Sequence, residues 1–173
     1  MSALALLLAL ALAGCASAFP SEVTVGVNRE VTVAGLRAAE PGTFVNQRVI
    51  VGGEILATTP KEGQTEIEVL SRRLRSDESP ERSDRSDGRF LVRAAQFLDP
   101  AVFAPGRRVT VLGTVTGEEQ RPLGAVPFRY PVIASDAITL WPRDLPPYPY
   151  PYYYGPYWPY WGWGASWGVR GGW

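Results

Sequence analysis

Hydrophobic and polar residues alternate with a period of two over much of the chain between positions 48 and 141. In 108–116, for example, three valines and a glycine fill one set of alternate positions, and mostly polar residues fill the other. This is the period of a strand that packs one face on a core and turns the other to solvent. The pattern predicts strands at 48–57, 65–70, 88–93 and 108–116, and a last one from the apolar runs 131–133 and 137–141.

The alternation also assigns faces and connections. In the second predicted strand Ile67 and Val69 face inward, whereas Glu66 and Glu68 face outward to solvent. The segment 60–64 (PKEGQ) is rich in turn residues and predicts the first hairpin connection. A second connection is predicted for GEEQRPLG, where solvated charge explains Glu118 and Glu119. We read Arg107 and Arg108, before the fourth strand, as a pair that keeps a sheet edge solvated.

Five strands rich in β-branched residues, with glycines inside them and no long helical pattern, predict an all-β fold. Our prediction is a small five-stranded, OB-like, partly open barrel, and a β-sandwich fragment is the alternative. One turn of helix is expected where Asp99 caps Pro100, with Phe97 and Leu98 packed under the barrel. A catalytic reading of Asp99 would need a second carboxylate at a fixed separation, and the sequence identifies none.

The stretch 71–89 is highly charged, with six Arg, five acidic residues and five Ser. Such a run buries little apolar surface, so we expect a mobile, solvated loop. The alternative is that its basic half, Arg72, Arg73 and Arg75, contacts phosphates of lipid or lipopolysaccharide. We favour the solvated loop, because the acidic residues neutralise the basic ones within a few positions.

The N-terminus reads as a processing signal. Residues 2–14 are apolar or small, and at 13 residues they are too few to span a bilayer. Leu12-Ala13-Gly14-Cys15 looks like a bacterial lipobox, which predicts cleavage before Cys15 and its modification with diacylglycerol and a fatty acid such as palmitate. The alternative is an ordinary signal peptide with a chance cysteine. Met1 and Ser2 lack the usual Lys or Arg, which leaves an upstream start codon or the N-terminal amine as the source of positive charge.

Lipidation at Cys15 would tether the protein to a membrane rather than insert it across one. Ala16 follows in place of the Asp typical of inner-membrane retention, which indicates the outer membrane. The valines at 23, 25 and 27 indicate either a tether or a short strand at a sheet edge. The predicted organisation is a signal peptide at 1–14, a lipidated N-terminus and linker at 15–40, the barrel domain at 41–144 and an aromatic tail at 145–173.

The tail has an extreme composition, since 24 of its 29 residues are Tyr, Trp, Pro or Gly and Arg170 is its only charged residue. Its prolines disfavour helix and sheet, so an extended or disordered backbone is expected. Its rings suit three partners: the membrane interface, another protein or a second copy, and the sugar faces of envelope glycans. A tail without a defined partner is the remaining alternative.

Composition then excludes several classes of function. Seventeen basic residues balance seventeen acidic ones, so no overall field attracts nucleic acid, and we expect no such partner. The chain has no His and one Cys, which rules out Ser-His-Asp and Cys-His nucleophiles, imidazole metal sites and an intrachain disulfide. We therefore expect no enzyme activity, no catalytic or metal-binding residues and no cofactor.

A family resemblance covers about 100 residues of the chain. The pieces that carry it are Gly88-Arg89-Phe90, Phe97-Leu98-Asp99-Pro100, the strand VTVLGTVTG from Val109, the region from Gly124 to Tyr130, the ending Leu140-Trp141, and upstream Gly52-Gly53-Glu54-Ile55 with 65–70. Together these resemble the Slp family of bacterial outer-membrane lipoproteins, named for starvation-inducible lipoproteins. The resemblance implies a lipid-anchored, periplasm-facing protein with a link to stationary-phase or stress physiology, and it brings no catalytic residues.

The leading hypothesis is thus a non-enzymatic envelope lipoprotein with a structural or interaction role. It contacts the membrane through lipid on Cys15, and envelope protein, lipid or glycan through the tail. The competing hypothesis is a module that binds a small ligand or oligosaccharide on an OB-like face, with Arg93, Arg108 and exposed aromatic residues as generic candidates.

Overall fold

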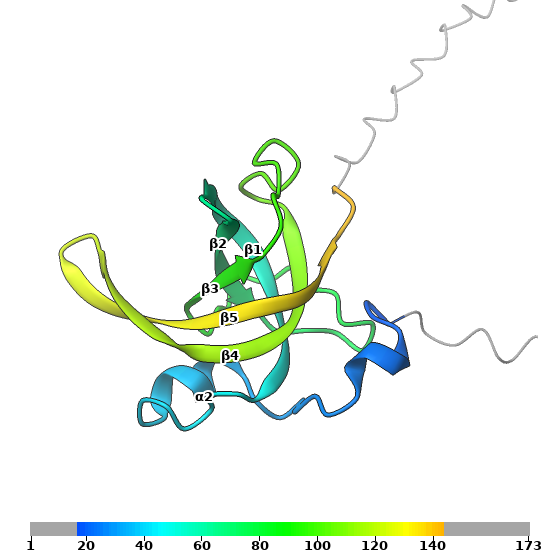
Figure 1. Cartoon of the computed structure of the whole chain (residues 1–173), viewed down its shortest axis with the longest axis horizontal. Coiled ribbons are helices and arrows are strands. Elements are labelled where there is room, and N and C mark those ends of the chain that lie inside the picture. Colours follow the sequence, from blue (N-terminus) through cyan, green and yellow to red (C-terminus); the bar gives the residue numbers. More distant parts are fainter. Residues whose placement is uncertain (1–16, 144–173) are drawn as a thin grey trace, which may run out of the picture. The chain divides into compact units, whose positions relative to one another are not determined.

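Five strands close into a barrel in the computed structural model, which describes residues 17–143 (Figure 1). The elements are η2 (Ser21–Thr24), α2 (Val33–Ala38), β1 (Arg48–Lys61), β2 (Gln64–Arg72), β3 (Arg89–Ala94), β4 (Arg108–Leu123) and β5 (Val126–Leu140). Around the barrel the order is β1-β2-β3-β5-β4. All neighbours are antiparallel except β3 and β5, which pair in parallel over residues 91–93 and 132–134. The predicted all-β, OB-like barrel is confirmed, and it is closed.

The barrel interior is filled by the inward set of alternate residues. Ile67 and Val69 of β2 are fully buried, as the alternation predicted, and so is Phe90 of β3. Most of the rest of this cluster comes from the five strands and from α2, namely Val49, Val51, Ile55, Val92, Ala94, Val109, Val111, Val115, Ile133, Val33 and Leu36, and Val31 and Leu98 complete it. Since burying one such side chain contributes roughly 1.5–3 kcal/mol, this cluster is the main source of stability.

Two glycines let strands approach closely. A Cβ at Gly53 would lie 2.0 Å from the Leu70 carbonyl oxygen, and one at Gly113 would lie 2.2 Å from that of Ala134. Any other residue at either position would push neighbouring strands apart. The β1–β2 register shifts between Ile55 and Ala57, just beyond the Gly52-Gly53 pair.

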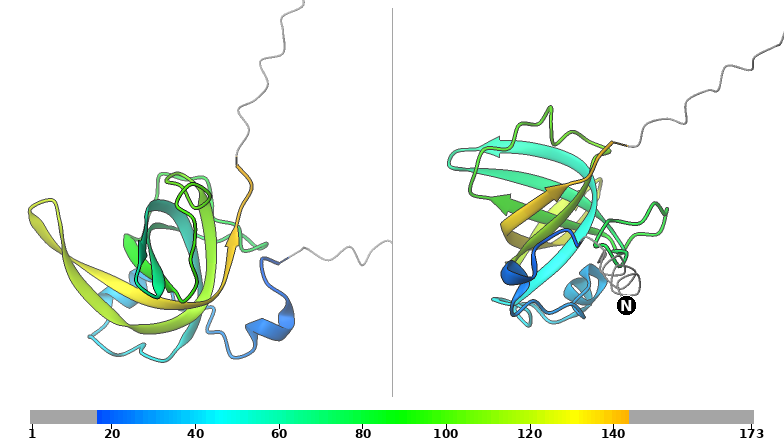
Figure 2. Two further views of the ribbon diagram at one scale, coloured as in Figure 1. Left: turned by 45° about the horizontal axis from the view of Figure 1, so that its top comes forward. Right: turned by 90° about the vertical axis from the view of Figure 1, so that its right-hand side faces the viewer.

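The strands are longer than the alternation indicated. β1 continues through Pro60 to Lys61, so the connection to β2 is shorter than the predicted 60–64 turn. β4 and β5 extend past the barrel as a two-stranded ribbon that is visible on one side of the molecule (Figure 2). Glu118 and Glu119 therefore lie in a strand, and not in a connection as predicted.

The prolines of this ribbon explain why the sequence pattern did not predict it as strand. Pro122 and Pro127 face each other across the ribbon, in the last pairs before its turn. A proline cannot donate to a ladder, but it is tolerated where its nitrogen faces a free edge. The ribbon beyond the barrel provides such edges, because β1 pairs with β4 only as far as Thr114.

Residues 17–40 are neither a tether nor an edge strand. They carry η2, a single parallel bridge between Val27 and Arg48, and α2, whose Val33 and Leu36 join the barrel core. Thr32 caps α2 by accepting a hydrogen bond from the Gly35 amide at 3.1 Å. The alternating valines that suggested a strand thus belong to a helical turn and the loop after it.

Two local predictions near Asp99 have different outcomes. The Asp99 carboxylate accepts from the Ala101 amide at 2.8 Å, which caps a hydrogen-bonded turn but starts no helix. Leu98 is buried, as predicted, whereas Phe97 is 72% exposed and does not pack under the barrel. The predictions for Cys15 and for the tail at 145–173 lie outside the described residues.

Candidate functional site

The N-terminal segment, residues 17–27, covers the outer face of β1, β4 and β5. Phe19 is 5% exposed and packs with Ile50 and Leu112 in a second apolar cluster, outside the barrel. The Ala18 carbonyl accepts a hydrogen bond from the Thr139 hydroxyl of β5 at 3.1 Å. The chain is therefore fixed to the barrel surface from Ser17 onward, two positions after the predicted lipidation site.

Glu78 holds this segment from the other side. Its side chain is 6% exposed, accepts from the Ser17 hydroxyl at 2.6 Å and pairs with Arg29 at 2.5 Å. Burial alone would raise the pKa of the Glu78 carboxyl, but the hydrogen bonds from Ser17 and Arg29 outweigh it and lower the pKa below its usual value. Glu78 is thus a buried carboxylate that stays ionised. It binds Arg29 and Ser17, which precede it in the sequence by 49 and 61 positions.

The loop that carries Glu78 is ordered, in contrast to the mobile loop predicted for 71–89. The Glu78 carbonyl accepts from the buried Thr110 hydroxyl of β4 at 2.7 Å, and Leu74 pairs with Pro80 within the loop. Ser79 is also buried. The first two residues, Ser71 and Arg72, belong to β2. The loop is held by contacts with residues that are distant in sequence, and local composition does not reveal such contacts.

The three arginines proposed for phosphate have different surroundings. Arg72 pairs with Glu54 at 3.3 Å and donates to the Arg85 carbonyl. Arg73 and Arg75 are exposed. Two of the three, Arg72 and Arg73, line a hollow of about 280 Å³ at the surface.

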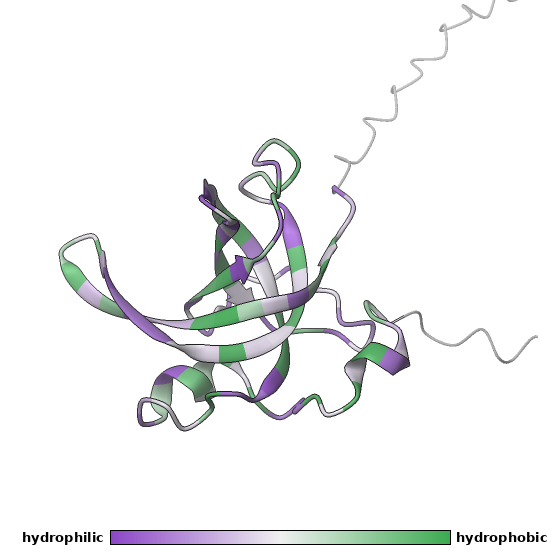
Figure 3. Ribbon diagram, viewed as in Figure 1, coloured by the Kyte–Doolittle hydropathy of each residue, from purple (hydrophilic) through white to green (hydrophobic). Residues whose placement is uncertain are grey.

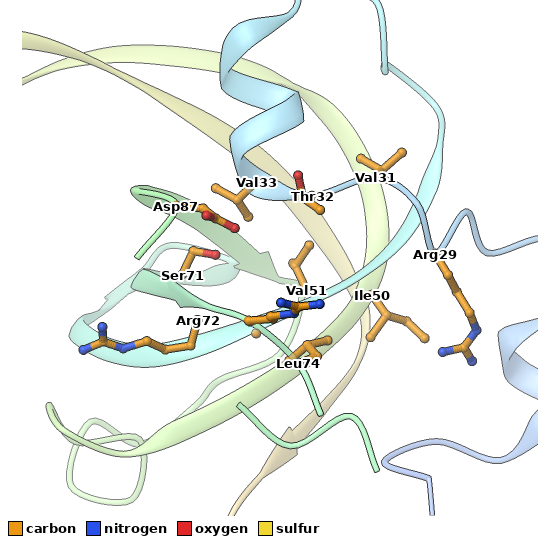
Figure 4. Close-up of a pocket in the computed structure, with 12 residues that line it drawn as sticks. Arg29, Val31, Thr32, Val33, Ile50, Val51, Ser71, Arg72, Leu74 and Asp87 are labelled. Atoms are coloured by element: carbon orange, nitrogen blue, oxygen red, sulfur yellow. The ribbon is translucent and has the colours of Figure 1, made fainter. Parts of the chain in front are cut away.

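That hollow lies between the start of α2, β1 and the end of β2 (Figure 4). Val31, Val33 and Val51 give it an apolar wall, while Arg29 lies at one end and Asp87 at the other (Figure 4). Arg29 and Arg72 are paired with carboxylates, and Asp87 offsets the charge of Arg73 in the lining, so the hollow carries little excess positive charge. It is suited to a small amphipathic group rather than to a polyanion.

A second polar site, which the sequence did not indicate, lies outside the barrel under the β4–β5 ribbon. We call it the ionic cluster, and it consists of Lys61, Glu66, Arg93, Glu119 and Arg121. Arg121 of the ribbon binds Glu66 through two hydrogen bonds of 2.7 and 2.8 Å. Arg121 also contacts Glu119 at 2.6 Å, and Arg93 pairs with the same Glu119.

Glu66 is the buried centre of the ionic cluster, with a side chain only 7% exposed. The two-point contact with Arg121 is the largest influence on its carboxyl, and with Lys61 it overcomes desolvation and lowers the pKa to about 2. The alternation correctly turned Glu66 away from the barrel interior but wrongly predicted that it meets solvent. No local signal could have found its partner, since Arg121 is 55 positions away.

The remaining predicted positions serve the fold. Arg107 donates to the carbonyls of Val102 and Trp141, and Arg108 donates to that of Pro80. Since β4 pairs with β1 and with β5, these arginines do not line an edge, contrary to prediction. Arg93 and Arg108, the generic ligand-binding candidates, have separate partners and are not brought together.

The structure of residues 17–143 also bears on metal binding and on membrane spanning. No three His, Cys, Asp or Glu side chains in this range are grouped so that they could hold a metal ion. No helix in the same range is long and apolar enough to cross a membrane.

Comparisons with known proteins agree on a family. Residues 12–167 match the outer membrane lipoprotein Slp family. The outer membrane protein Slp of Escherichia coli (strain K12) is 32% identical over 130 residues, which cover 73% of this chain and 69% of that protein. The uncharacterized lipoprotein YeaY of the same organism is 32% identical over 126 residues, which cover 69% of this chain and 65% of that protein.

Among solved structures, the mitochondrial single-stranded DNA binding protein Rim1 of S. cerevisiae has a TM-score of 0.35 and 14% identity, covering 55% of this chain and 94% of its own. A TM-score this low gives no information on function.

Proposed function

This chain belongs to the Slp family of outer-membrane lipoproteins, and from that premise we propose that it is a non-catalytic envelope module held flush with the membrane. In this proposal, lipid on Cys15 provides the anchor, the barrel faces the periplasm, and the protein acts through contacts with other envelope components.

One observation carries the proposal, namely the attachment of the N-terminal segment. Ser17 is hydrogen-bonded to Glu78 and Ala18 to Thr139, so only Ala16 separates the fixed chain from Cys15. Two residues span at most about 7 Å even when extended. A lipid on Cys15 would therefore hold this side of the barrel at the headgroup layer, without a flexible linker between them.

The experiment is an intact-mass measurement of the protein from membranes, together with protease digestion of cells. We expect a mass that corresponds to cleavage before Cys15 plus diacylglycerol and a fatty acid, and release of the Cys15→Ala protein from the membrane fraction. The barrel should resist protease in intact cells and become accessible when the outer membrane is permeabilised. Digestion in intact cells would contradict the periplasmic orientation.

The interaction role is proposed for the tail at 145–173, because its rings outnumber those of the barrel and its single charge leaves them free for apolar contacts. Photocrosslinkers at tail positions in cells should give defined protein, lipid or glycan adducts. Diffuse labelling without a defined adduct would argue against a specific tail contact. The link to stationary phase or stress remains part of the proposal, and protein levels in growing and starved cells would test it.

Binding of a small ligand or oligosaccharide is the second candidate. The hollow of about 280 Å³ between α2 and β1 is the observation that favours it. Shifts of NMR resonances from Val31, Val51 and Arg73 on titration with envelope oligosaccharides would support this function. Titration without such shifts would leave the contact role as the better account.

A further inference from the structure

We propose that the loop between Phe19 and Val27 inserts its two exposed valines into the phospholipid surface next to the anchor. This inference rests on the proposed lipidation of Cys15 and adds a second membrane contact, made by protein. We name residues 20–26 the contact loop.

Both ends of the contact loop are fixed on the barrel. Phe19 and Val27 pack in the same apolar cluster with Ile50 and Leu112, so the loop leaves the surface and returns to nearly the same place. Between them, Val23 is 42% and Val25 is 72% exposed. Figure 3 shows hydrophobic bands on this helical segment near the N-terminal end of the described chain. Two large apolar side chains therefore project from a short loop that is anchored at both ends.

The backbone of the contact loop is already hydrogen-bonded. Arg48 donates to the Val25 carbonyl at 2.6 Å and to the Val23 carbonyl at 3.0 Å, and Asp136 orients its guanidinium at 3.2 Å. The Val23 amide donates to the Pro20 carbonyl at 3.2 Å. Polar backbone groups without partners are what make insertion into lipid unfavourable. Here several of them are satisfied within the protein, and the valine side chains are left without cover.

The position of the contact loop identifies its occupant. Ser17 is held by Glu78 and Phe19 is buried, so the loop begins three residues after a fixed point that lies at most about 7 Å from Cys15. An acylated Cys15 places the headgroup layer at this same site. A phospholipid surface is thus the apolar partner that this side of the barrel meets as soon as the anchor is in place.

Charge around the contact loop is mixed. Arg29 and Arg48 are outnumbered by Glu22, Glu30 and Asp136, so electrostatic attraction to anionic lipid contributes little. Insertion through valines should therefore occur in neutral phosphatidylcholine vesicles as readily as in anionic ones.

The chain offers a matched control in Val126, which is 63% exposed at the turn of the β4–β5 ribbon. Figures 1 and 2 show that turn on the opposite side of the barrel from the N-terminal segment. Val25 and Val126 thus have the same side chain and similar exposure, but only Val25 is near the anchor.

The test uses full-length lipidated protein with V25C or V126C, each labelled with an environment-sensitive fluorophore. Acylation consumes the native thiol of Cys15, so each variant has one reactive cysteine. In phosphatidylcholine vesicles we expect the label at 25 to shift to the blue, to lose quenching by aqueous iodide and to be quenched by lipids spin-labelled near the headgroup, because interfacial segments lie roughly 5–10 Å deep. The label at 126 should show none of these changes.

Three results would decide against the inference. If intact mass shows unmodified Cys15, the proposed function and the inference both fail, because no anchor then brings the contact loop to the membrane. If the protein is lipidated but labels at 25 and 126 respond to iodide equally, the loop inference alone is wrong. A blue shift at 25 without quenching by spin-labelled lipid would mean that protein, such as a second copy, covers the loop, which also overturns it.

A V23S/V25S variant provides an independent measurement. Its lipid anchor and barrel core are intact, so it should fold and fractionate with membranes, as should V126S. We expect V23S/V25S to exchange between vesicles several-fold faster than V126S, since it has lost the second contact. Equal exchange rates would contradict insertion.

Discussion

Two parts of the barrel's outer surface are covered by distant segments of chain, and each cover combines apolar packing with contacts to one buried carboxylate, Glu78 in one and Glu66 in the other. On one, the N-terminal segment packs Phe19 against Ile50 and Leu112. On the other, the β4–β5 ribbon folds over β2 and β3 and binds through Glu66 and Arg121. Each cover hides a face that the alternation of the strands predicted to be open to solvent.

The difference between them shows what each cover depends on. The N-terminal segment combines the buried apolar area around Phe19, which responds weakly to pH and salt, with hydrogen bonds to the buried Glu78 carboxylate. The ionic cluster depends on the charge of one buried carboxylate, whose pKa of about 2 records how strongly its partners favour the ionised form. At low pH the Phe19 contacts of the N-terminal segment are therefore expected to persist while the carboxylate contacts of both covers weaken.

The largest expected effect is the loss of the Phe19 ring. Phe19→Ala should lower the free energy of unfolding by about 3 kcal/mol, because it removes a buried ring and leaves a cavity above Ile50 and Leu112. Urea unfolding of the purified protein would measure this change. Phe97→Ala is the control, since Phe97 is 72% exposed and its loss should change stability by less than about 0.5 kcal/mol. Equal effects of the two substitutions would mean that the N-terminal segment is not bound as described.

The next effect is on the ribbon. Glu66→Gln should destabilise the protein by about 2 kcal/mol, because Arg121 and Lys61 lose the charge that they share. The comparison is Asp136→Asn, which breaks an ion pair whose side chains are 34% and 47% exposed and should reduce stability by less than about 1 kcal/mol. If Glu66→Gln is as mild as Asp136→Asn, the ionic cluster does not hold the ribbon.

A pH series examines the same carboxylate without changing the barrel. Its pKa is lowered from 4.5 to about 2 on folding, so its contribution is complete above pH 4.5 and is lost as pH falls toward 2. The stability difference between wild type and Glu66→Gln should thus be constant at neutral pH and shrink below pH 4.5. A difference that stays unchanged at pH 2.5 would assign the effect to packing rather than to charge.

The barrel itself could be predicted because its strands follow a local rule. A period of two placed Ile67, Val69 and Val111 in the core, and the structure buries all three completely. The N-terminal segment and the β4–β5 ribbon, which cover the barrel, followed no such local rule. The valines at 23 and 25 have the spacing of a strand but lie in a helical turn and the loop after it, and Phe19 and Val27 on either side of them pack in the same apolar cluster.

The charged regions likewise have structure that local composition did not predict. Composition predicted a mobile loop at 71–89, yet Glu78 is buried because Ser17, Arg29 and Thr110 all contact it. Likewise, Glu119 looked like a solvated turn residue and lies in a strand opposite Tyr130. Ser17 and Arg29 are far from Glu78 in sequence, and Arg93 is 26 positions from Glu119. A charge that is matched over such a separation leaves no local pattern in the sequence.

The smallest expected effect tests the join between anchor and barrel. Ser17→Ala removes the hydrogen bond to the Glu78 carboxylate but leaves Arg29 in place, so global stability should fall by about 1 kcal/mol. Ser21→Ala, at an exposed position in η2, should have almost no effect. Amide hydrogen exchange separates the two outcomes more sharply than unfolding does. Loss of the Ser17 bond should raise exchange at the Val23 and Val27 amides while the barrel strands stay protected, because Phe19 then remains as the main attachment of the segment. Unchanged exchange there would show that Phe19 and Thr139 suffice to hold the chain, and that Glu78 serves only the loop in which it lies.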